Sequence, residues 1–285
     1  MTDKKLPITL QDLDARDDAV RVIPLGGLDE IGMNCSLFEH NGEFLMLDCG
    51  QMMPDEEMLG VDYVIPDMTL LEGAPEKLKA IVLSHMHEDH IGALPYVLPK
   101  FPNVPVYASE LTIAILREKL KEHNLKPKFV ELVPRETVTI GAFEIEPISV
   151  THSTIDTLGF GIRTPIGSIV HTGDFKIDPH PPDGVAFDHF AFAKYAEADD
   201  EGVMLLMSDS TNVDRRGSCP SEMEVLPELE SIFRAAPAGI VVSTFASSLH
   251  RIQNILNLAA EHDRTVVALG LNMERNIRIA SKIGA

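Results

Sequence analysis

Short apolar runs that end at polar or turn-forming residues recur along the first three quarters of the chain. Runs rich in β-branched side chains predict strands, and the polar residues behind them mark where each strand stops. Strands are predicted at residues 43–47, 80–83 and 144–150, and a further short β-rich run at residues 167–174. The pattern predicts a β-rich α/β domain over residues 21–215, whereas residues 1–20 show little periodicity and are expected to form a flexible tail.

Helical periodicity is clearest at residues 111–120, where apolar positions recur three and four residues apart. Beyond residue 216 the predicted elements alternate between helix and strand. Helices are predicted at residues 222–235, 250–261 and 273–282, and strands at residues 239–244 and 265–270. Such alternation is typical of a doubly wound α/β unit, so residues 216–285 are predicted to form a second, partial α/β domain.

The composition is that of a globular protein. The chain has 285 residues, of which 45% are hydrophobic, and this supports a sizeable core. No apolar run approaches the ~20 residues of a membrane helix, and the start lacks the apolar core of a signal peptide. Three scattered cysteines indicate reduced thiols and a cytoplasmic location rather than a disulfide framework.

One polar segment carries most of the chemical information. Residues 85–90 contain three histidines and two carboxylates, directly after a predicted strand. Imidazole nitrogens and carboxylate oxygens are suitable ligands for a borderline divalent metal such as zinc. In extended backbone His85 and His87 point the same way, while Asp89 and His90 follow at a turn and can face a neighbouring ion. The spacing therefore predicts two metal ions.

Further candidate ligands follow other predicted strands. His152, Asp174 and Asp48 each come after an apolar run, and ligands commonly bind at strand ends in open α/β sheets. We expect one ion to be bound by His85, His87 and His152, and the second by Asp89 and His90, with Asp174 bridging the two. Asp48 is expected to accept the remaining N–H of a ligand imidazole and so to fix its tautomer.

A turn before the predicted helix 250–261 is a candidate phosphate site. Small residues there allow backbone N–H groups at a helix start to approach a phosphate, and Ser247, Ser248 and His250 add polar side chains. An ordinary serine N-cap explains the same residues equally well. Asp209, after another apolar run, has a similar alternative as a simple turn residue.

The pattern resembles the metallo-β-lactamase superfamily. Asp48, the segment 85–90, His152 and Asp174 match its first four motifs, with Met86 in place of the usual glycine. The chain is similar in more detail to the ribonuclease J family of β-CASP nucleases. That similarity is carried by residues 22–32, 59–67, 171–176, 208–212 and 244–251. It implies a metallo-β-lactamase αββα sandwich over residues 21–215, followed by a partial β-CASP domain over residues 216–285.

The resemblance also implies an activity. Family members are metal-dependent ribonucleases that process and degrade RNA, including rRNA, as 5′-3′ exonucleases on 5′-monophosphorylated ends and as endonucleases. It implies two divalent ions, zinc or alternatively manganese, and a homodimer or homotetramer for the full-length protein. It assigns catalytic roles to Asp89 and Asp174, substrate contacts to Ser247, Ser248, Leu249 and His250, and a supporting role to Asp209.

Two further departures from the family pattern and the net charge keep other functions open. Ser248 replaces the family's usual asparagine, and the sequence ends at Ala285, before the family's last metal-binding histidine, which predicts a truncated enzyme with reduced activity. The net charge of −20 opposes RNA binding. A small-molecule hydrolase (thioesterase or lactonase) and a non-catalytic structural module therefore remain alternatives. The segment after Asp209 favours the nuclease, since a small-molecule hydrolase has no need of it.

Overall fold

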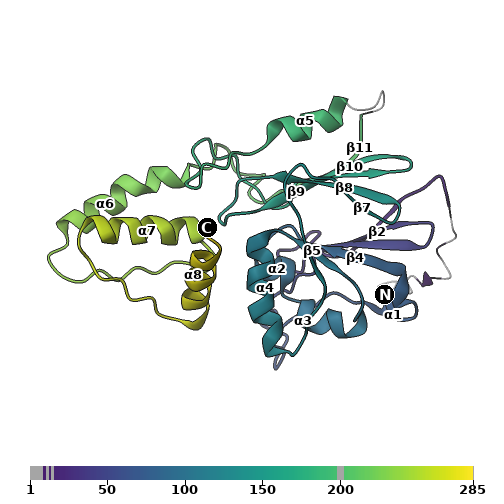
Figure 1. Cartoon of the computed structure of the whole chain (residues 1–285), viewed down its shortest axis with the longest axis horizontal. Coiled ribbons are helices and arrows are strands. Elements are labelled where there is room, and N and C mark those ends of the chain that lie inside the picture. The colour runs from purple at the N-terminus through teal and green to yellow at the C-terminus, as the bar shows by residue number, and fades with distance from the viewer. Residues whose placement is uncertain (1–8, 11–12, 14–15, 198–201, 285) are drawn as a thin grey trace.

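Two β-sheets packed face to face form the centre of the molecule (Figure 1). The computed structural model describes residues 9–10, 13, 16–197 and 202–284. Most of the predicted tail, residues 1–20, lies outside the described residues.

The first sheet contains six strands in chain order. They are β1 (Arg21–Gly26), β2 (Cys35–His40), β3 (Glu43–Leu47), β4 (Leu78–Val82), β5 (Val106–Ala108) and β6 (Phe129–Glu131). The strands β1 to β3 pair antiparallel, whereas β3 to β6 pair parallel. The carboxyl ends of five strands, β1 and β3 to β6, therefore meet at one edge of this sheet.

The second sheet has the order β11-β10-β9-β8-β7. Its strands are β7 (Val138–Ile140), β8 (Phe143–Ser149), β9 (Leu158–Thr164), β10 (Gly167–His171) and β11 (Val203–Met207). Only β10 and β11 are parallel, and the helix α5 (His189–Glu197) connects them. Both β10 and β11 therefore end toward the same edge, where the chain continues to Asp174 and Asp209.

Helices complete four layers. The outer face of the first sheet carries α1 (Thr69–Glu72), η2 (Pro75–Lys77), α2 (Glu88–Ile91), α3 (Leu94–Val97), η3 (Leu98–Lys100) and α4 (Glu110–Glu122). In α4 the apolar stripe Leu111, Ile115, Leu116 and Leu120 is buried against this sheet, which explains the helical periodicity. A separate apolar core that includes Phe38, Phe143 and Phe160 fills the space between the sheets. The predicted αββα sandwich is confirmed.

The C-terminal part is helical. It contains η4 (Glu222–Val225), α6 (Leu226–Ala235), α7 (Leu249–Glu261) and α8 (Leu271–Ile283), which project to one side of the sandwich in Figure 1. The three predicted helices are present, but the predicted strands at residues 239–244 and 265–270 are wrong: both segments are irregular. A strand needs a hydrogen-bonded neighbour, and no described residue pairs with either segment. The side chains of Val241 and Leu269 are accordingly 98% and 82% exposed.

These helices are nevertheless fixed to the sandwich. Leu249, Ile252 and Ile279 join the apolar core beneath the first sheet. The segment between β11 and η4 includes the predicted domain boundary at residue 215. After this segment, hydrogen bonds to Asp178 attach the start of η4 to the sandwich. The Asp178 carboxylate accepts N–H groups of Glu222 and His180, at 3.0 and 2.9 Å.

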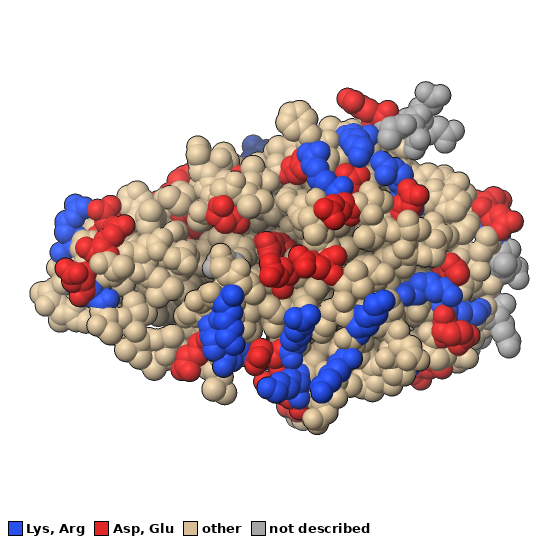
Figure 2. All heavy atoms as spheres, viewed as in Figure 1, with Lys and Arg blue, Asp and Glu red and all other residues tan. Residues whose placement is uncertain are grey.

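The surface charges are separated on the face shown in Figure 2. Lys and Arg side chains form a row across its lower part, where α4 and α8 lie, and Asp and Glu side chains gather above them at the centre. Among the described residues, no helix combines the length and apolar character that crossing a bilayer requires.

Candidate metal centre

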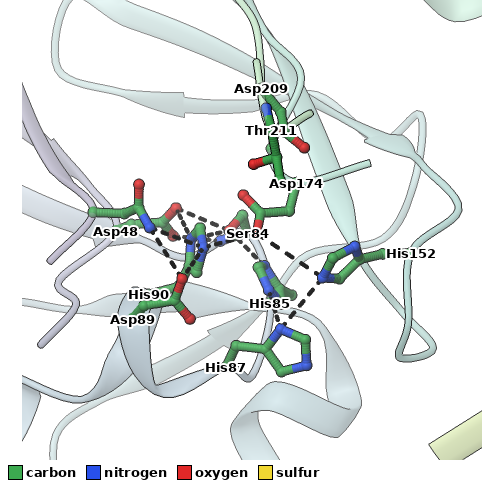
Figure 3. Close-up of polar contacts among 12 residues, drawn as sticks. Asp48, Ser84, His85, His87, Asp89, His90, His152, Asp174, Asp209 and Thr211 are labelled. Atoms are coloured by element: carbon green, nitrogen blue, oxygen red, sulfur yellow. Dashed lines mark hydrogen bonds and ion pairs between the residues drawn. The ribbon is translucent and has the colours of Figure 1, made fainter. Parts of the chain in front are cut away.

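The predicted ligands come together where strands of both sheets end (Figure 3). The segment 84–90 follows β4, His152 follows β8, and Asp174 follows β10. A backbone hydrogen bond links the two sheets beside these ends, because Leu158 N at the start of β9 donates to Ser84 O at 3.0 Å. The candidate ligands are thus supplied by loops at the edges of both sheets.

Three imidazoles form the first ligand group. His87 Nδ1 lies 2.9 Å from His85 Nε2 and 3.3 Å from His152 Nε2. Nitrogens bound at 2.0–2.1 Å to a tetrahedral zinc are separated by about 3.4 Å, which is close to this spacing. His85, His87 and His152 are one of two groups in the described residues whose ligand atoms converge closely enough to hold an ion.

The second group combines His85, His90 and Asp174. His90 Nε2 lies 3.4 Å from Asp174 Oδ2 and 3.4 Å from Asp89 Oδ2. Asp174 Oδ2 also lies 3.9 Å from His152 Nε2, so this carboxylate faces both groups. This is the arrangement expected of a carboxylate between two neighbouring ions.

Buried polar groups hold His90 in place. Asp48 Oδ2 accepts a hydrogen bond from His90 Nδ1 at 2.8 Å, which leaves His90 Nε2 directed toward Asp89 and Asp174. Ser84 donates to the same Asp48 carboxylate through its backbone N and its Oγ, at 2.7 and 2.9 Å. Asp48 is 2% exposed, so a single buried carboxylate fixes the orientation of this imidazole.

The Asp174 loop is supported by residues farther along the chain. Asp209 Oδ2 accepts the N–H of Phe175 at 3.3 Å, and Asp209 N donates to Thr172 Oγ1 at 2.9 Å. His171 Nδ1 accepts the N–H of Gly173 at 3.0 Å. Asp209 and His171 therefore brace the turn that presents Asp174 without facing the ligand atoms themselves.

The electrostatics suit cation binding. Burial lowers the pKa values of His85 and His87, and lowers the pKa of His152 to about 4, so these imidazoles are neutral ligands at pH 7. Burial opposes ionisation of Asp174, but His90 lowers the pKa of this carboxyl to about 2.

His90 behaves differently. It is fully buried, yet Asp48, Asp174 and Asp89 raise its pKa well above its ordinary value. This local excess of carboxylates stabilises a proton on His90, and it would stabilise a divalent cation for the same reason.

Close backbone packing leaves no room for a side chain at Gly50. A Cβ there would lie 1.6 Å from the carbonyl oxygen of Asp89. The backbone of Asn34 lies against the same segment, donating its N–H to Asp89 O at 2.9 Å. The loop after β3 thereby sets the position of the Asp89–His90 backbone.

Asn34 is a neighbour of the ligands that sequence reasoning missed. Its Nδ2 lies 3.4 Å from Asp89 Oδ2 and 3.1 Å from His90 Nε2. Its only sequence signal is its place after the glycine-rich segment 26–32, just before β2. An asparagine in such a loop is too common to stand out before the fold brings it beside Asp89.

The predicted phosphate turn is only partly directed at the site. Ser247 and Ser248 are half-buried, but the Leu249 side chain lies in the apolar core, so only its backbone is available. His250 is 5% exposed, with Nε2 3.2 Å from Asp183 Oδ2. A cavity of about 240 Å³ is lined by both His250 and His152, which connects the start of α7 with the first ligand group.

Comparisons with known proteins define the class. Residues 29–204 match the metallo-β-lactamase superfamily, so the chain belongs to that superfamily. A solved structure of a protein of unknown function from Enterococcus faecalis superposes with a TM-score of 0.68 at 19% identity. That superposition covers 93% of this chain and 68% of the other, and it supports the fold.

More similar relatives point to one branch. Residues 238–285 match the ribonuclease J β-CASP domain. The chain is 42% identical to ribonuclease J of Mycolicibacterium smegmatis, over 93% of this chain and 47% of the relative. It is 45% identical to ribonuclease J of Thermus thermophilus, over 94% and 48% respectively. The chain thus spans about half the length of these relatives.

Proposed function

We propose that this protein is a metal-dependent ribonuclease that hydrolyses RNA phosphodiester bonds. The observation that carries the proposal is the pair of adjacent ligand groups, both faced by Asp174, in a chain that is 42–45% identical to two ribonucleases J. The β-CASP match at residues 238–285 separates it from small-molecule hydrolases of the superfamily, and it speaks against a thioesterase or lactonase.

The proposed centre holds two divalent ions. His85, His87 and His152 would bind one, while Asp89 and His90 would bind the other, with Asp174 between them. Zinc fits the first group because three imidazole nitrogens lie near tetrahedral spacing, and manganese is the alternative for the oxygen-richer second group. When bound, the ions would supply Lewis-acid charge that activates water and stabilises developing charge on phosphate.

The chain's own residues prepare this chemistry. Asp48 keeps a proton on His90 Nδ1, so that Nε2, which faces the site, is the nitrogen that would exchange its proton for a cation. Asp89 and Asp174 present carboxylates on opposite sides of His90, where each can orient a water against a phosphodiester. The packing around His85, which is fully buried, excludes bulk water from one side of the centre.

The proposed substrate is RNA with a 5′-monophosphate. Its 5′ end would enter the cavity lined by His152 and His250, with the terminal phosphate near the Ser247–Ser248 backbone at the start of α7. Both exonucleolytic and endonucleolytic cleavage are part of the proposal, as are roles in RNA processing and decay. A cytoplasmic location and a homodimeric or homotetrameric full-length protein are proposed on the sequence resemblance and the unpaired cysteines.

The decisive experiment is cleavage of end-labelled, 5′-monophosphorylated RNA with added zinc or manganese. Asp89→Ala should abolish cleavage, whereas the matched variant Asp67→Ala, in an exposed loop before α1, should leave it unchanged. Chelation should also abolish it, and restored metal should recover it. Equal cleavage by the wild type and Asp89→Ala would refute the proposed centre.

A further inference from the structure

One charged surface has no role in the metal centre. Arg117 and Lys121 lie four residues apart on α4, hence on one helix face. Lys126 and Lys128 follow in the exposed segment that leads into β6. These four residues are here called the basic band, and all four are exposed.

Two acids next to the band on α4 are already paired. Glu118 and Glu122 of α4 face α8, where they form ion pairs with Arg278 and Arg275 at 3.7 and 3.3 Å. Lys119 pairs with Glu88. Among the described residues, none forms an ion pair with any member of the basic band. In a chain of net charge −20, four exposed cations without ion pairs give this surface a local positive charge.

Packing holds part of the band in position. The Arg117 guanidinium lies over the Phe129 ring, 5.8 Å from its centroid, which joins the face of α4 to the edge strand β6. Phe129 is half-buried, and Lys128 precedes it. The band therefore combines two residues of α4 with two residues of the irregular segment directly before β6, and the Arg117–Phe129 contact joins α4 to that strand.

The band is aligned with the cavity of the proposed centre. Glu110 at the start of α4 and Glu131 at the end of β6 both line the cavity that contains His152 and His250. Arg117 lies seven residues along α4, about 10 Å from that rim, and Lys121 about 16 Å from it. Lys128 directly precedes β6 and is three residues from Glu131, which corresponds to about 10 Å along the strand direction.

We propose that the basic band binds the phosphates of single-stranded RNA whose end occupies the cavity. This inference rests on the proposed ribonuclease function. Glu110 and Glu131 repel phosphate at the rim but accept hydrogen bonds from base amino groups, so backbone attraction begins beyond the rim, at the band. A single strand fits because a cavity of about 240 Å³ is too small for a duplex end. Cations beside a half-buried aromatic ring are typical of surfaces that bind single strands.

The test is binding of fluorescent 5′-monophosphorylated RNA, followed by anisotropy at several salt concentrations in chelator, so that no cleavage occurs. The variant Arg117→Gln/Lys121→Gln/Lys128→Gln is compared with Lys100→Gln/Lys194→Gln/Arg234→Gln. The control removes the same charge from lysines and an arginine that lie in ion pairs elsewhere. Thermal melting checks that both variants remain folded.

The band variant should bind a 12-nucleotide RNA more weakly and lower the slope of log K against log salt by about 2, since each contact contributes ~0.7 for single strands. A dinucleotide, which ends near the rim, should bind both variants alike. Equal salt slopes for the two variants would overturn the proposal. The proposal would also be overturned if the band variant lost as much affinity for heparin or duplex RNA as for the 12-nucleotide RNA, because the surface would then be a general polyanion site.

Cleavage is scored separately, on the dinucleotide. Dinucleotide hydrolysis that Asp89→Ala abolishes, together with unchanged long-RNA binding by the band variant, would refute the band while the ribonuclease proposal survives. Band-dependent binding of long RNA without any hydrolysis would refute the ribonuclease proposal and leave the band as an RNA-binding surface.

Discussion

The sandwich and the C-terminal part both contain short apolar runs with strand-like sequences, but only the runs in the sandwich form hydrogen-bonded strands. In the sandwich, the strand-like runs pair with neighbours, and side chains such as Phe160 are fully buried. In the C-terminal part, the runs at residues 239–244 and 265–270 have equally apolar sequences but remain unpaired and largely exposed. A helix satisfies its own backbone, whereas a strand depends on a partner elsewhere in the chain. The candidate metal ligands all lie in the sandwich, where the strands are paired.

The largest expected loss of stability comes from a substitution at Gly50, where the sandwich is tightly packed. Gly50→Ala would place a Cβ 1.6 Å from the Asp89 carbonyl oxygen. Backbone must move to relieve this overlap, so we expect a loss of at least about 3 kcal/mol in the free energy of unfolding and displacement of Asp89. Urea denaturation and metal analysis measure the two effects.

Gly73→Ala is the matched control, since no atom lies within 4 Å of the position that its new methyl group would occupy and its φ of −76° suits alanine. If Gly50→Ala were as stable as Gly73→Ala and retained its metal, the loop after β3 would not be the rigid support we describe.

The next effect concerns the buried carboxylate of the sandwich. Asp48→Asn keeps the left-handed backbone, at φ 59°, that asparagine tolerates, but it removes the charge from His90 Nδ1. We expect the affinity of the second ion to fall about 10–100-fold while the first ion is retained. Competition with a fluorescent chelator measures both affinities. Equal loss of both ions would show that Asp48 supports the whole fold rather than His90.

A substitution at Asp178, which connects the sandwich to the C-terminal helices, should have an intermediate effect on stability. Hydrogen bonds from Ser221 and from the N–H groups of Glu222 and His180 outweigh burial and lower the Asp178 pKa to about 2. Asp178→Asn replaces an acceptor oxygen with an amino group, leaving one of these donors unpaired at a cost of about 1–3 kcal/mol. Hydrogen exchange should show faster exchange in η4 and α6 than in the sandwich.

The same connection predicts a pH dependence. Because folding lowers the pKa of Asp178, its ionised form stabilises the fold above the ordinary carboxyl pKa, and this stabilisation disappears as pH falls from about 4 to about 2. Asp178→Asn should remove that part of the pH dependence, whereas the exposed Asp263→Asn should not. Identical acid-unfolding profiles for the wild type and Asp178→Asn would contradict this assignment.

The smallest effect should come from the unpaired runs. Leu269→Ser changes a side chain that is 82% exposed, so we expect the free energy of unfolding to change by less than about 0.5 kcal/mol. Leu258→Ala, within the small core of α6 and α7, should cost about 2 kcal/mol or more. Thermal melting compares the two. A large loss for Leu269→Ser would mean that residues 265–270 are packed in solution.

Sequence patterns predicted elements well where the information is local. The periodicity of α4 and the apolar runs of β3 and β8 gave their positions within one or two residues, and the spacing in 85–90 placed four candidate ligands together. Non-local information was missing elsewhere. Strand propensity at 239–244 does not reveal whether a partner exists, and Asn34 becomes a neighbour of His90 only after β2 and β4 are aligned in one sheet. The burial of Leu249 depends in the same way on how α7 docks.

The origin of the ligands from two sheets has a kinetic consequence. His85, His87 and His90 come from one short segment, but His152 and Asp174 arrive with β8 and β10 of the other sheet. A folding chain can complete the ligand groups only after the two sheets have packed, so bound metal would add little to the folding rate. Separating the sheets would instead require breaking metal–ligand bonds first. The ions would act on the rate of unfolding, making the lifetime of the folded state depend on metal retention.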